Sequence, residues 1–150
     1  MAATLTPARP EHTALLVELM QEFYAESGYS MDRDRAHRAF QDLLADTSLG
    51  RVWLIHRDDQ IAGYVILTLG YSLEYGGRDA FVDDLYLCPP FRGQGLGKLA
   101  LVQLRETCLE LGVRALHLEV ERENHSAASL YRRSGFVGHN RELLTLRLTE

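Results

Sequence analysis

Apolar side chains in the first third of the chain recur at the spacing of a helix face. Between Pro10 and Gly28 the leucine, methionine and phenylalanine residues lie mostly three or four positions apart. Because proline suits a first helical turn, a helix is predicted from Pro10 up to Gly28. A short strand over residues 2–6 precedes it, and a second amphipathic helix is predicted over residues 32–44.

The middle of the chain reads as three strands. The segment "RVWLIHRDDQIAGYVILTLGYSL" (residues 51–73) predicts two of them, joined by a turn at Asp58 and Asp59. The second is apolar on both faces, which is typical of a strand covered on both sides. Gly76 and Gly77 mark a further turn, and "AFVDDLYLC" (residues 80–88) predicts the third strand.

The last third of the chain alternates helices and strands. A helix is predicted from about Gly95 to Leu111, "VRALHLEVE" (residues 113–121) alternates as a strand, and a short helix follows over residues 126–133. "LLTLRL" (residues 143–148) predicts a closing strand. The element order β-α-α-β-β-β-α-β-α-β indicates an α/β protein of the α+β type, with helices on both faces of a mixed, mostly antiparallel sheet.

Composition narrows the functional classes. The chain of 150 residues is long enough for one domain (residues 1–150) with a real core, and its net charge of −5 argues against a nucleic-acid partner. Cys88 and Cys108 are read as free thiols in a reducing compartment, and the histidines have no metal-ligand spacing. With no leader and no apolar run of membrane-spanning length, we expect a cytoplasmic protein without metal or membrane partners.

A glycine-rich loop is the main chemical feature of the sequence. "FRGQGLGKL" (residues 91–99) has three glycines at alternate positions between Arg92 and Lys98, where a strand passes into a helix. Glycine is costly to order, and such a loop turns backbone N–H groups toward an anion such as a pyrophosphate. A nucleotide-triphosphate loop would need GxxxxGK followed by serine or threonine, and a dinucleotide loop would need glycine at position 98. Both patterns fail here.

Two segments of the sequence resemble the GNAT family of N-acetyltransferases. "LYLCPPFRGQGLGKLAL" is similar to its acetyl-CoA-binding motif Q/R-x-x-G-x-G/A, with Arg92, Gly95 and Gly97 at the defined positions. "LHLEVERENHSAASLYRRSGF" resembles its second signature, in which Asn124 is followed seven residues later by Tyr131. The two motifs cover residues 81–136 in the expected order, so the resemblance spans most of the chain.

The resemblance implies a fold and a set of cofactor contacts. In the GNAT fold the two central strands splay apart, and pantetheine lies in the gap like an added strand. Backbone contacts to pantetheine are then expected from Leu85 and Leu87, and a contact from Asn124, which also suits a helix cap. The pyrophosphate is expected on the loop. Its residues are Arg92, Gly93, Gln94, Gly95, Leu96, Gly97 and Lys98.

The resemblance also implies a reaction. Acetyl-CoA is the expected co-substrate, and its acetyl group passes to a primary amine by direct attack in a ternary complex. Tyr131 matches the tyrosine that donates a proton to the coenzyme A sulfur, a role that suits a phenol because it stays protonated at neutral pH. Periodicity alone also allows Tyr131 to be a helix tyrosine packed on the sheet. Relatives are often dimers, so a homodimer is expected.

The candidate base is Asp83. Asp83 and Asp84 lie inside an otherwise apolar strand, where an unpaired buried charge is costly. Strict alternation predicts Asp83 on the face of Phe81 and Leu85, and Asp84 on the opposite face. The strand resembles that of spermidine/spermine-type (diamine) enzymes, in which a glutamate at this position acts through water as the base. The alternative is that these carboxylates cap a loop or pair with an arginine.

The acetyl acceptor stays open at this point. Glu22, Glu26 and Glu74, together with the two aspartates, favour an acidic cleft and a small cationic amine. Glu22 and Glu26 are also spaced as a solvated helix face. The alternatives are a protein lysine or N-terminal acetyltransferase, or a non-catalytic acyl-CoA sensor that would need neither Tyr131 nor Asp83.

Overall fold

The computed structural model describes residues 2–149, and its centre is one sheet in the order β1-β2-β3-β4-β5. Neighbouring strands are antiparallel from β1 to β4, and β5 is parallel to β4. The antiparallel part is therefore a simple meander, and β5 follows after a helical crossover. The strands are β1 (Ala3–Pro7), β2 (Gly50–Arg57), β3 (Gln60–Ser72), β4 (Gly77–Leu87) and β5 (Ala115–Leu118).

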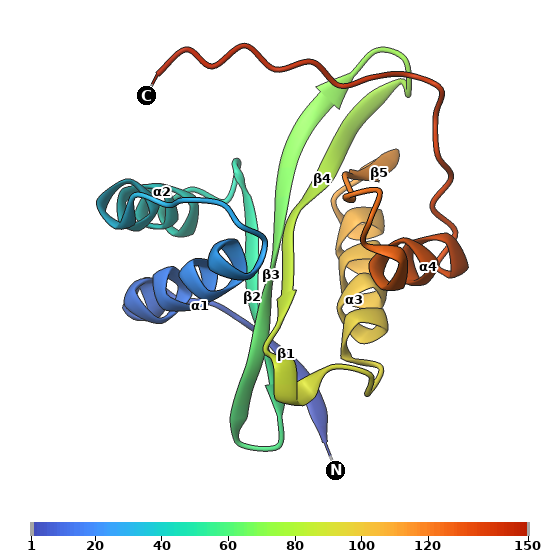
Figure 1. Cartoon of the computed structure of the whole chain (residues 1–150). Helices are drawn as coiled ribbons and strands as arrows, with labels where there is room; N and C mark the ends of the chain where they lie inside the picture. Colours follow the sequence, from blue (N-terminus) through green and yellow to red (C-terminus); the bar gives the residue numbers. More distant parts are fainter. Residues whose placement is uncertain (1, 150) are drawn as a thin grey trace.

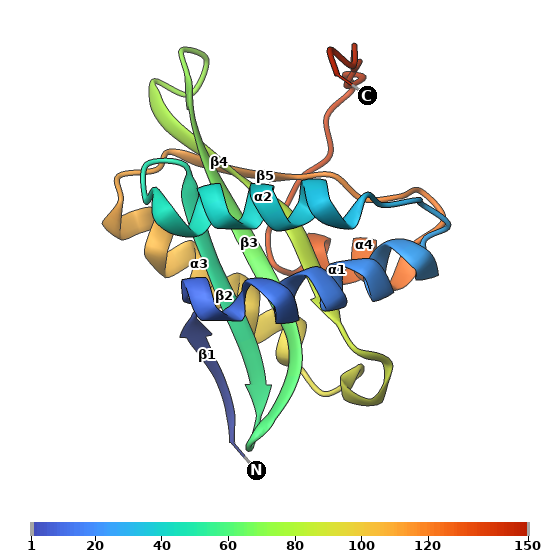
Figure 2. The same ribbon diagram turned by 90° about the vertical axis from the view of Figure 1, so that its left-hand side faces the viewer.

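Helices cover both faces of the sheet (Figures 1 and 2). α1 and α2 lie on one face, while α3 and α4 lie on the other. The start of α2 follows from its sequence, because the Asp32 carboxylate accepts the Arg35 backbone N–H at 3.1 Å as a cap. The bounds are α1 (Thr13–Glu26), α2 (Arg33–Ala45), α3 (Leu96–Glu110) and α4 (His125–Arg133), with 3-10 turns at Pro10–His12 and Pro89–Phe91.

Each face of the sheet has its own hydrophobic core. On the α3 side, Leu96, Ala100 and Leu104 pack against strand residues such as Ile55 and Leu67, all at most 1% exposed. On the other side, α1 and α2 pack against β2, β3 and β4, through residues that include Leu16, Phe40, Leu54, Tyr64 and Tyr86. The sheet is thus covered on both sides, as the apolar sequence of β3 predicts.

A β-bulge in β4 overturns the predicted placement of the two aspartates. Ile66 of β3 pairs with Asp84 and Leu67 pairs with Val82, so Asp83 is an extra residue without a partner. Before the bulge Val82 packs on the α3 side, and after it Leu85 does. Asp83 and Asp84 therefore both lie on the α1 side, and Leu85 lies on the opposite face. Strict alternation was wrong here because the bulge shifts the phase by one residue.

The predicted closing strand is also wrong. None of the described residues 137–149 is in a strand, and β5 spans only Ala115–Leu118 instead of the predicted 113–121. The segment after α4 is extended and passes the tip of the β3–β4 hairpin (Figure 1). The Arg141 guanidinium donates to both carboxylate oxygens of Glu74 in that hairpin, at 2.9 and 2.5 Å. A strand needs a neighbouring edge, and this path leads away from β5.

Candidate active site

A cavity opens where β4 and β5 separate. The two strands pair only from Asp79 with Ala115 to Val82 with Leu118, and the bulge at Asp83 follows at once. The cavity has a volume of about 1320 Å³, and its walls come from β4, the loop before α3, β5 and α4. The splayed central strands predicted for this sheet are therefore confirmed, and the gap between them is the candidate active site.

Part of the β4 backbone faces this gap, where the Leu87 carbonyl accepts a hydrogen bond from Arg92 Nε at 2.9 Å. The Cys88 N–H donates to the Ala62 carbonyl at 2.8 Å, so the backbone of Cys88 points toward β3. Because the hydrogen-bonding direction alternates along an antiparallel pair, the backbone of Tyr86 also points to β3, whereas Leu85 and Leu87 point to the gap. Both leucines line the cavity, and their contact with pantetheine stays a prediction from the family resemblance.

The glycine-rich loop forms the next wall and starts α3. Gly93 (φ 75°) and Gly95 (φ 82°) are in the left-handed region, and Gly95 is the N-cap of α3. The first helical hydrogen bond there is from the Leu99 N–H to the Gly95 carbonyl, at 3.1 Å. The N–H groups of the residues between them precede that bond and have no helical acceptor. This helix N-terminus suits an anion.

The third glycine has a different role. Gly97 lies in the first turn of α3, where an added Cβ atom would come within 2.9 Å of a Leu130 methyl group on α4. The absence of a side chain therefore lets α4 approach the start of α3 closely. This contact brings the residues of α4 to the same cavity as the loop.

Most of the predicted loop residues line the cavity, but two side chains have other partners. The loop residues that line the cavity are Arg92, Gly93, Gly95, Leu96, Gly97 and Lys98. Gln94 is not among the lining residues, and its side-chain amide donates to the Pro90 carbonyl at 3.2 Å. The Arg92 guanidinium pairs with Glu26 of α1 at 2.7 Å and lies 5.8 Å from the centre of the Tyr86 ring. Arg92 thus ties the loop to α1.

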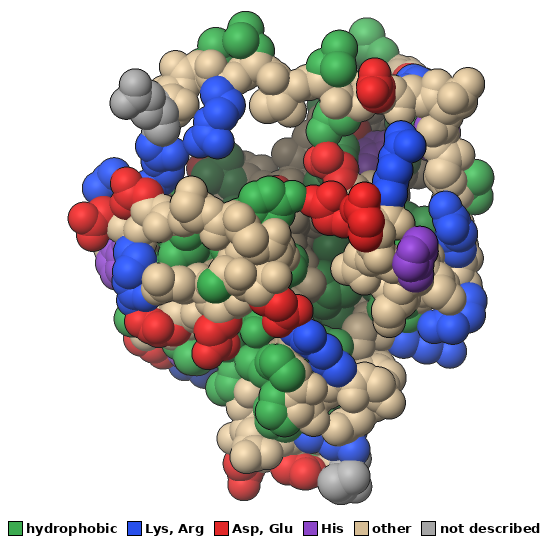
Figure 3. Space-filling view, in the orientation of Figure 1, with side chains coloured by type: hydrophobic (Ala, Val, Ile, Leu, Met, Phe, Trp, Pro, Cys, Tyr) green, Lys and Arg blue, Asp and Glu red, His purple; other side chains and the backbone are tan. Residues whose placement is uncertain are grey.

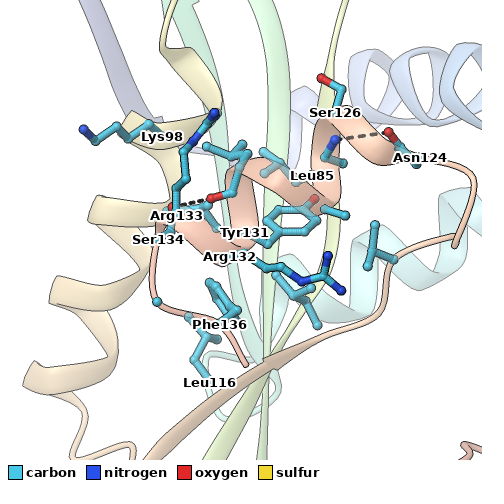
Figure 4. Close-up of a pocket in the computed structure, with 18 of the residues that line it drawn as sticks. Leu85, Lys98, Leu116, Asn124, Ser126, Tyr131, Arg132, Arg133, Ser134 and Phe136 are labelled. Atoms are coloured by element: carbon cyan, nitrogen blue, oxygen red, sulfur yellow. Dashed lines mark hydrogen bonds between the residues drawn. The ribbon is translucent and has the colours of Figure 1, made fainter. Parts of the chain in front are cut away.

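α4 brings the two residues of the second motif to the cavity. Asn124 caps the helix by accepting the Ala127 N–H at 3.2 Å, and both residues line the cavity. Tyr131 packs edge-on against Phe136, with ring centres 6.0 Å apart. Figure 4 shows Tyr131 on the cavity wall, on the side of Leu85. Burial raises the pKa of Tyr131, so its phenol is protonated at neutral pH.

Asp83 and Asp84 lie beside this cavity but are not among the residues that line it. The Tyr64 hydroxyl donates to the Asp84 carboxylate at 3.1 Å. Burial, and then the charge of Asp83, raise the pKa of Asp84 to about 7. Removal of water also raises the pKa of Asp83. On α1, burial and the charges of both aspartates raise the pKa of Tyr24 to about 12, which places all these groups in one cluster.

Comparison with known proteins agrees with this geometry. The sequence matches the acetyltransferase (GNAT) family over residues 14–136. This match spans most of the chain, including both motifs and the elements that form the cavity. The chain is a member of the GNAT family. Members of this family use acetyl-CoA, and this GNAT protein is therefore an acetyltransferase.

Curated relatives agree at the level of the family. This GNAT acetyltransferase is 29% identical to the uncharacterized N-acetyltransferase YycN of Bacillus subtilis, over 91% of this chain and 93% of YycN. It is 33% identical to a thialysine N-epsilon-acetyltransferase of Bos taurus, over 50% of this chain and 44% of that enzyme. The predicted resemblance to N-acetyltransferases, with local similarity to the diamine type, is confirmed.

Solved structures confirm the fold. An integron cassette protein from the mobile metagenome of Cole Harbour Salt Marsh is 42% identical and has a TM-score of 0.88, over 97% of this chain and 91% of that one. An acetyltransferase of Clostridium acetobutylicum, solved with acetyl-CoA, has a TM-score of 0.82 at 20% identity, over 98% of this chain and 97% of that one. The α/β GNAT fold predicted from the sequence is therefore confirmed.

Sequence reasoning missed several cavity residues of this GNAT acetyltransferase. Three cationic side chains line the cavity in addition to those of the loop, namely Arg105 on α3 and Arg132 and Arg133 on α4. The signal was present, since Arg132 and Arg133 directly follow the proposed proton donor in "YRRSGF". Phe23 on α1 and Tyr86 on β4 also line the cavity and stack with ring centres 5.1 Å apart.

Within residues 2–149, no three histidine, cysteine or acidic side chains are grouped so that they could hold a metal ion. None of the helices in that range is long and apolar enough to cross a membrane. The ionisable side chains that line the cavity include those of Glu26, Arg92, Lys98 and Tyr131.

Proposed function

We propose that this GNAT acetyltransferase transfers the acetyl group of acetyl-CoA to the primary amine of a small cationic compound. The observation that carries this proposal is the meeting of three features at one cavity. These are the β4 backbone that faces the gap at Leu85 and Leu87, the glycine-capped N-terminus of α3, and the protonated phenol of Tyr131. Each feature matches one part of acyl transfer from a long thioester.

The donor is held mainly by backbone groups. Pantetheine carries amides that pair with the backbone N–H and C=O groups of Leu85 and with the N–H group of Leu87, as an added strand would. The Leu87 carbonyl is already bonded to Arg92 Nε. Its pyrophosphate lies at the unpaired N–H groups at the start of α3, where the helix dipole favours negative charge. Lys98 adds a positive charge beside them, and Asn124 contributes its side chain at the other end of the cavity.

The reaction needs a neutral amine and a protonated leaving group. An alkylammonium has a pKa of about 10, so a proton must leave before the nitrogen attacks the thioester carbon. Asp83 accepts this proton through water, because its carboxylate lies on the α1 side of β4, beside the cavity and not on its wall. As the new C–N bond forms and the C–S bond breaks, Tyr131 donates a proton to the sulfur of coenzyme A.

The acceptor enters from the α1 side. Phe23, Glu26 and Tyr86 line the cavity there, and Asp83 and Asp84 lie on the same face of β4. Acidic side chains also gather at the rim of the central hollow (Figure 3). Such a surface attracts cations. The thialysine acetyltransferase among the relatives acts, by its name, on a small amine of this kind, which supports the same substrate class here.

An acceptor screen tests this proposal. Thiol release from acetyl-CoA is measured with polyamines, lysine analogues, aminoglycosides, other amino acids and amino-terminal peptides. We expect turnover with small cationic amines. Activity with peptides alone would indicate a protein acetyltransferase, and tight coenzyme A binding without turnover would indicate a sensor. Either result would contradict the proposal.

Tyr131→Phe tests the proton donor with the best acceptor from that screen. The variant keeps the ring packing against Phe136 and loses only the hydroxyl. We expect kcat to fall by about a hundredfold, a typical contribution of general acid catalysis, with acetyl-CoA affinity nearly unchanged. Tyr71→Phe is the matched control, because Tyr71 is 73% exposed. A wild-type rate in Tyr131→Phe would remove this residue from the mechanism.

Asp83→Asn tests the base in the same assay. The amide cannot accept the ammonium proton, so the rise of the rate with pH should become flatter and kcat should fall. Asp59→Asn, in the β2–β3 turn, is the control. If the stability of the variant falls while its pH–rate profile stays that of the wild type, Asp83 is a structural residue.

A further inference from the structure

A histidine on the cavity wall is held by an aspartate of the neighbouring strand. The Nε2 atom of His117, on β5, lies 3.1 Å from the Oδ2 atom of Asp79, on β4, and their side chains are only 21% and 15% exposed. Because a carboxylate accepts hydrogen bonds, Nε2 carries the hydrogen and donates it, and the lone pair of the neutral imidazole is on Nδ1. His117 lines the cavity, so the pair brings a basic nitrogen to its wall.

The sheet itself fixes the position of the aspartate. Asp79 is paired with Gly70 of β3, where an added Cβ atom would come within 2.8 Å of the Asp79 Oδ1 atom. The lack of a side chain at Gly70 therefore leaves room for this carboxylate. On its other side Asp79 is paired with Ala115, two residues before His117 on β5. The carboxylate is thus held between two strands, beside the ring that it orients.

Two aromatic rings restrict the imidazole further. The ring centres of Tyr75 and Phe81 lie 5.1 and 5.0 Å from that of His117. Tyr75 belongs to the β3–β4 hairpin and also lines the cavity, whereas Phe81 is the β4 residue that is paired with His117. A base that is oriented by a third group in this way is typical of acid–base catalysis.

His117 and Asp83 are on the same face of the sheet. Leu116 and Leu118 pack on the α3 side, so His117 between them faces the α1 side, where Asp83 also lies. Phe81, the partner of His117, precedes Asp83 by two residues, which separates His117 and Asp83 by about 7 Å along the strands. A short chain of water molecules bridges a gap of this size.

A carboxylate alone is a poor final acceptor for the proton of an ammonium group. With ordinary pKa values of about 10 for the amine and about 4 for aspartate, the transfer is unfavourable by about a millionfold. Burial raises the pKa of Asp83, which reduces this penalty but keeps the proton in a part of the protein with little water. A free imidazole, with a pKa of about 6.5, reduces the penalty to about three-thousandfold.

We propose that His117, positioned by Asp79, is the final acceptor of the proton that the substrate amine loses before it attacks acetyl-CoA. This inference rests on the proposed function. The proton leaves the ammonium nitrogen, passes through water and the Asp83 carboxylate, and binds to His117 Nδ1. The products of this step are a neutral amine, a charged Asp83 and an imidazolium, whose charge the Asp79 carboxylate offsets. His117 returns the proton to solvent after the acetylated product leaves.

Other charged groups near His117 come from the hairpin and from the segment after α4. The hydrogen bond from Arg141 lowers the pKa of Glu74 most, and the charges of His139 and His117 also lower it. Glu74 therefore favours the imidazolium, as Asp79 does, whereas Arg141 and a protonated His139 oppose it. Because Arg141 is bound to both carboxylate oxygens of Glu74, these two charges largely cancel, and Asp79 is the main partner of the ring.

Removal of the imidazole gives the first test, with the full-length protein and the best amine from the acceptor screen. We expect His117→Ala to lower kcat by about a hundredfold, a typical contribution of a general base, while the KM of the amine and the affinity for coenzyme A stay nearly unchanged. His37→Ala on the exposed side of α2 is the control. If His117→Ala raises the KM of the amine and leaves kcat unchanged, His117 binds the substrate and the proposal is wrong.

Imidazole in the buffer separates lost chemistry from lost structure. His117→Ala leaves a ring-sized space between Tyr75 and Phe81, and free imidazole should raise the kcat of this variant by at least about tenfold. His117→Phe is the matched control, because it fills the same space with a ring that cannot accept a proton. It should be equally slow and should not respond to imidazole. No response in His117→Ala, or the same response in both variants, contradicts the proposal.

Asp79→Asn tests the positioning residue through the pH profile of kcat. Without the charge of the carboxylate the imidazolium is less stable, so the base should lose its proton at lower pH. The rise of kcat with pH should therefore move to lower pH, and its plateau should fall because the ring is no longer oriented. Asp59→Asn in the β2–β3 turn should keep the wild-type profile. An Asp79→Asn profile at the wild-type position would show that this carboxylate does not act on His117, against the proposal.

A double variant tests the order of the proton path. Asp83→Asn combined with His117→Ala should be about as slow as the slower of the two single variants, because both changes interrupt the same path. Losses that multiply would mean two separate paths and would overturn the relay. The acceptor screen separates this result from the proposed function. If the wild type acetylates no amine, the proposed function fails, whereas an active wild type with an equally active His117→Ala overturns the role of His117 alone.

Discussion

At the scale of single residues, the bulge at Asp83 decides which groups meet. It turns Asp84 toward the Tyr64 hydroxyl, in a part of the protein that excludes most water. One neutral hydrogen-bond donor does not replace the lost hydration of a carboxylate, and the charge of Asp83 is close by. The pKa of Asp84 is therefore raised to about 7, and the folded protein holds this proton much more tightly than the unfolded chain.

This raised pKa predicts the sign of a pH dependence. Between the ordinary pKa of 3.8 and about 7, the folded state binds more protons at Asp84 than the unfolded state, so this group lowers stability as pH rises. Asp84→Asn stays neutral and can still accept the Tyr64 hydrogen bond. Between pH 5 and pH 8, the free energy of unfolding of the wild type should therefore fall by about 2 kcal/mol more than that of Asp84→Asn.

Urea unfolding at both pH values measures this difference. Asp59→Asn in the exposed β2–β3 turn removes the same charge without the burial, and it should follow the wild type. Comparing variants in this way cancels the carboxylates whose pKa is lowered by hydrogen bonds, such as Asp32 and Asp46. Equal pH dependence in Asp84→Asn and the wild type would mean that Asp84 is charged in the folded protein.

At the scale of elements, local sequence patterns predict most of the fold. The helices form close to their predicted bounds, because caps, glycine stops and apolar spacing all act within a few residues. They were predicted near residues 10–28, 32–44, 95–111 and 126–133. Most of the glycine loop and Tyr131 line the cavity, and their roles toward acetyl-CoA stay predictions. These features depend on local geometry or on a motif that the family shares.

Two failures have a common physical cause. The bulge at Asp83 and the path of residues 143–148 are both set by neighbours distant in sequence. A bulge depends on the register with β3, and a strand depends on an available edge. "LLTLRL" carries the pattern of a strand, but the pattern does not say which edge receives it. The cationic side chains of α4 were missed because they follow Tyr131 on a helix whose position depends on the contact at Gly97.

Gly95→Val tests the loop as an element. Gly95 has a φ of 82°, which a β-branched residue adopts only at a cost of about 1–2 kcal/mol. We expect that loss of stability and a weakening of coenzyme A binding by at least about tenfold, because the N–H groups at the start of α3 turn away. Calorimetric titration with coenzyme A measures the binding.

Gly112→Val separates the two effects. Gly112 follows α3 at its other end and has a φ of 74°, with no atom within 4 Å of an added Cβ, as is also true of Gly95. It does not line the cavity. We therefore expect a similar loss of stability with unchanged affinity for coenzyme A. If Gly95→Val binds coenzyme A as tightly as Gly112→Val does, the loop is not the anion site.

At the scale of the whole molecule, the charge that gathers at the cavity is opposite in sign to the net charge of the protein. The chain carries a net charge of −5, and acidic side chains gather on the face shown in Figure 3. The cavity nevertheless collects cationic side chains from the loop, α3 and α4, namely Arg92, Lys98, Arg105, Arg132 and Arg133. With the proposed function, these cationic side chains would attract the anionic donor, and the acidic α1 side would attract a cationic acceptor.

The arginines of α4 should therefore contribute to donor binding through phosphate groups. Arg132 and Arg133 are exposed at the cavity, and Arg92 is already paired with Glu26. We expect Arg133→Gln to weaken coenzyme A binding by about tenfold, the usual loss for one charged hydrogen bond. The affinity of the variant should also depend less steeply on salt concentration than that of the wild type.

Arg122→Gln is the control for this prediction. It makes the same charge change outside the cavity lining and should change affinity little. Titration with coenzyme A and with its 3′-dephospho form at two salt concentrations measures this. Equal losses in Arg133→Gln and Arg122→Gln would mean that only the overall charge of the protein matters, and not the position of the cation at the cavity.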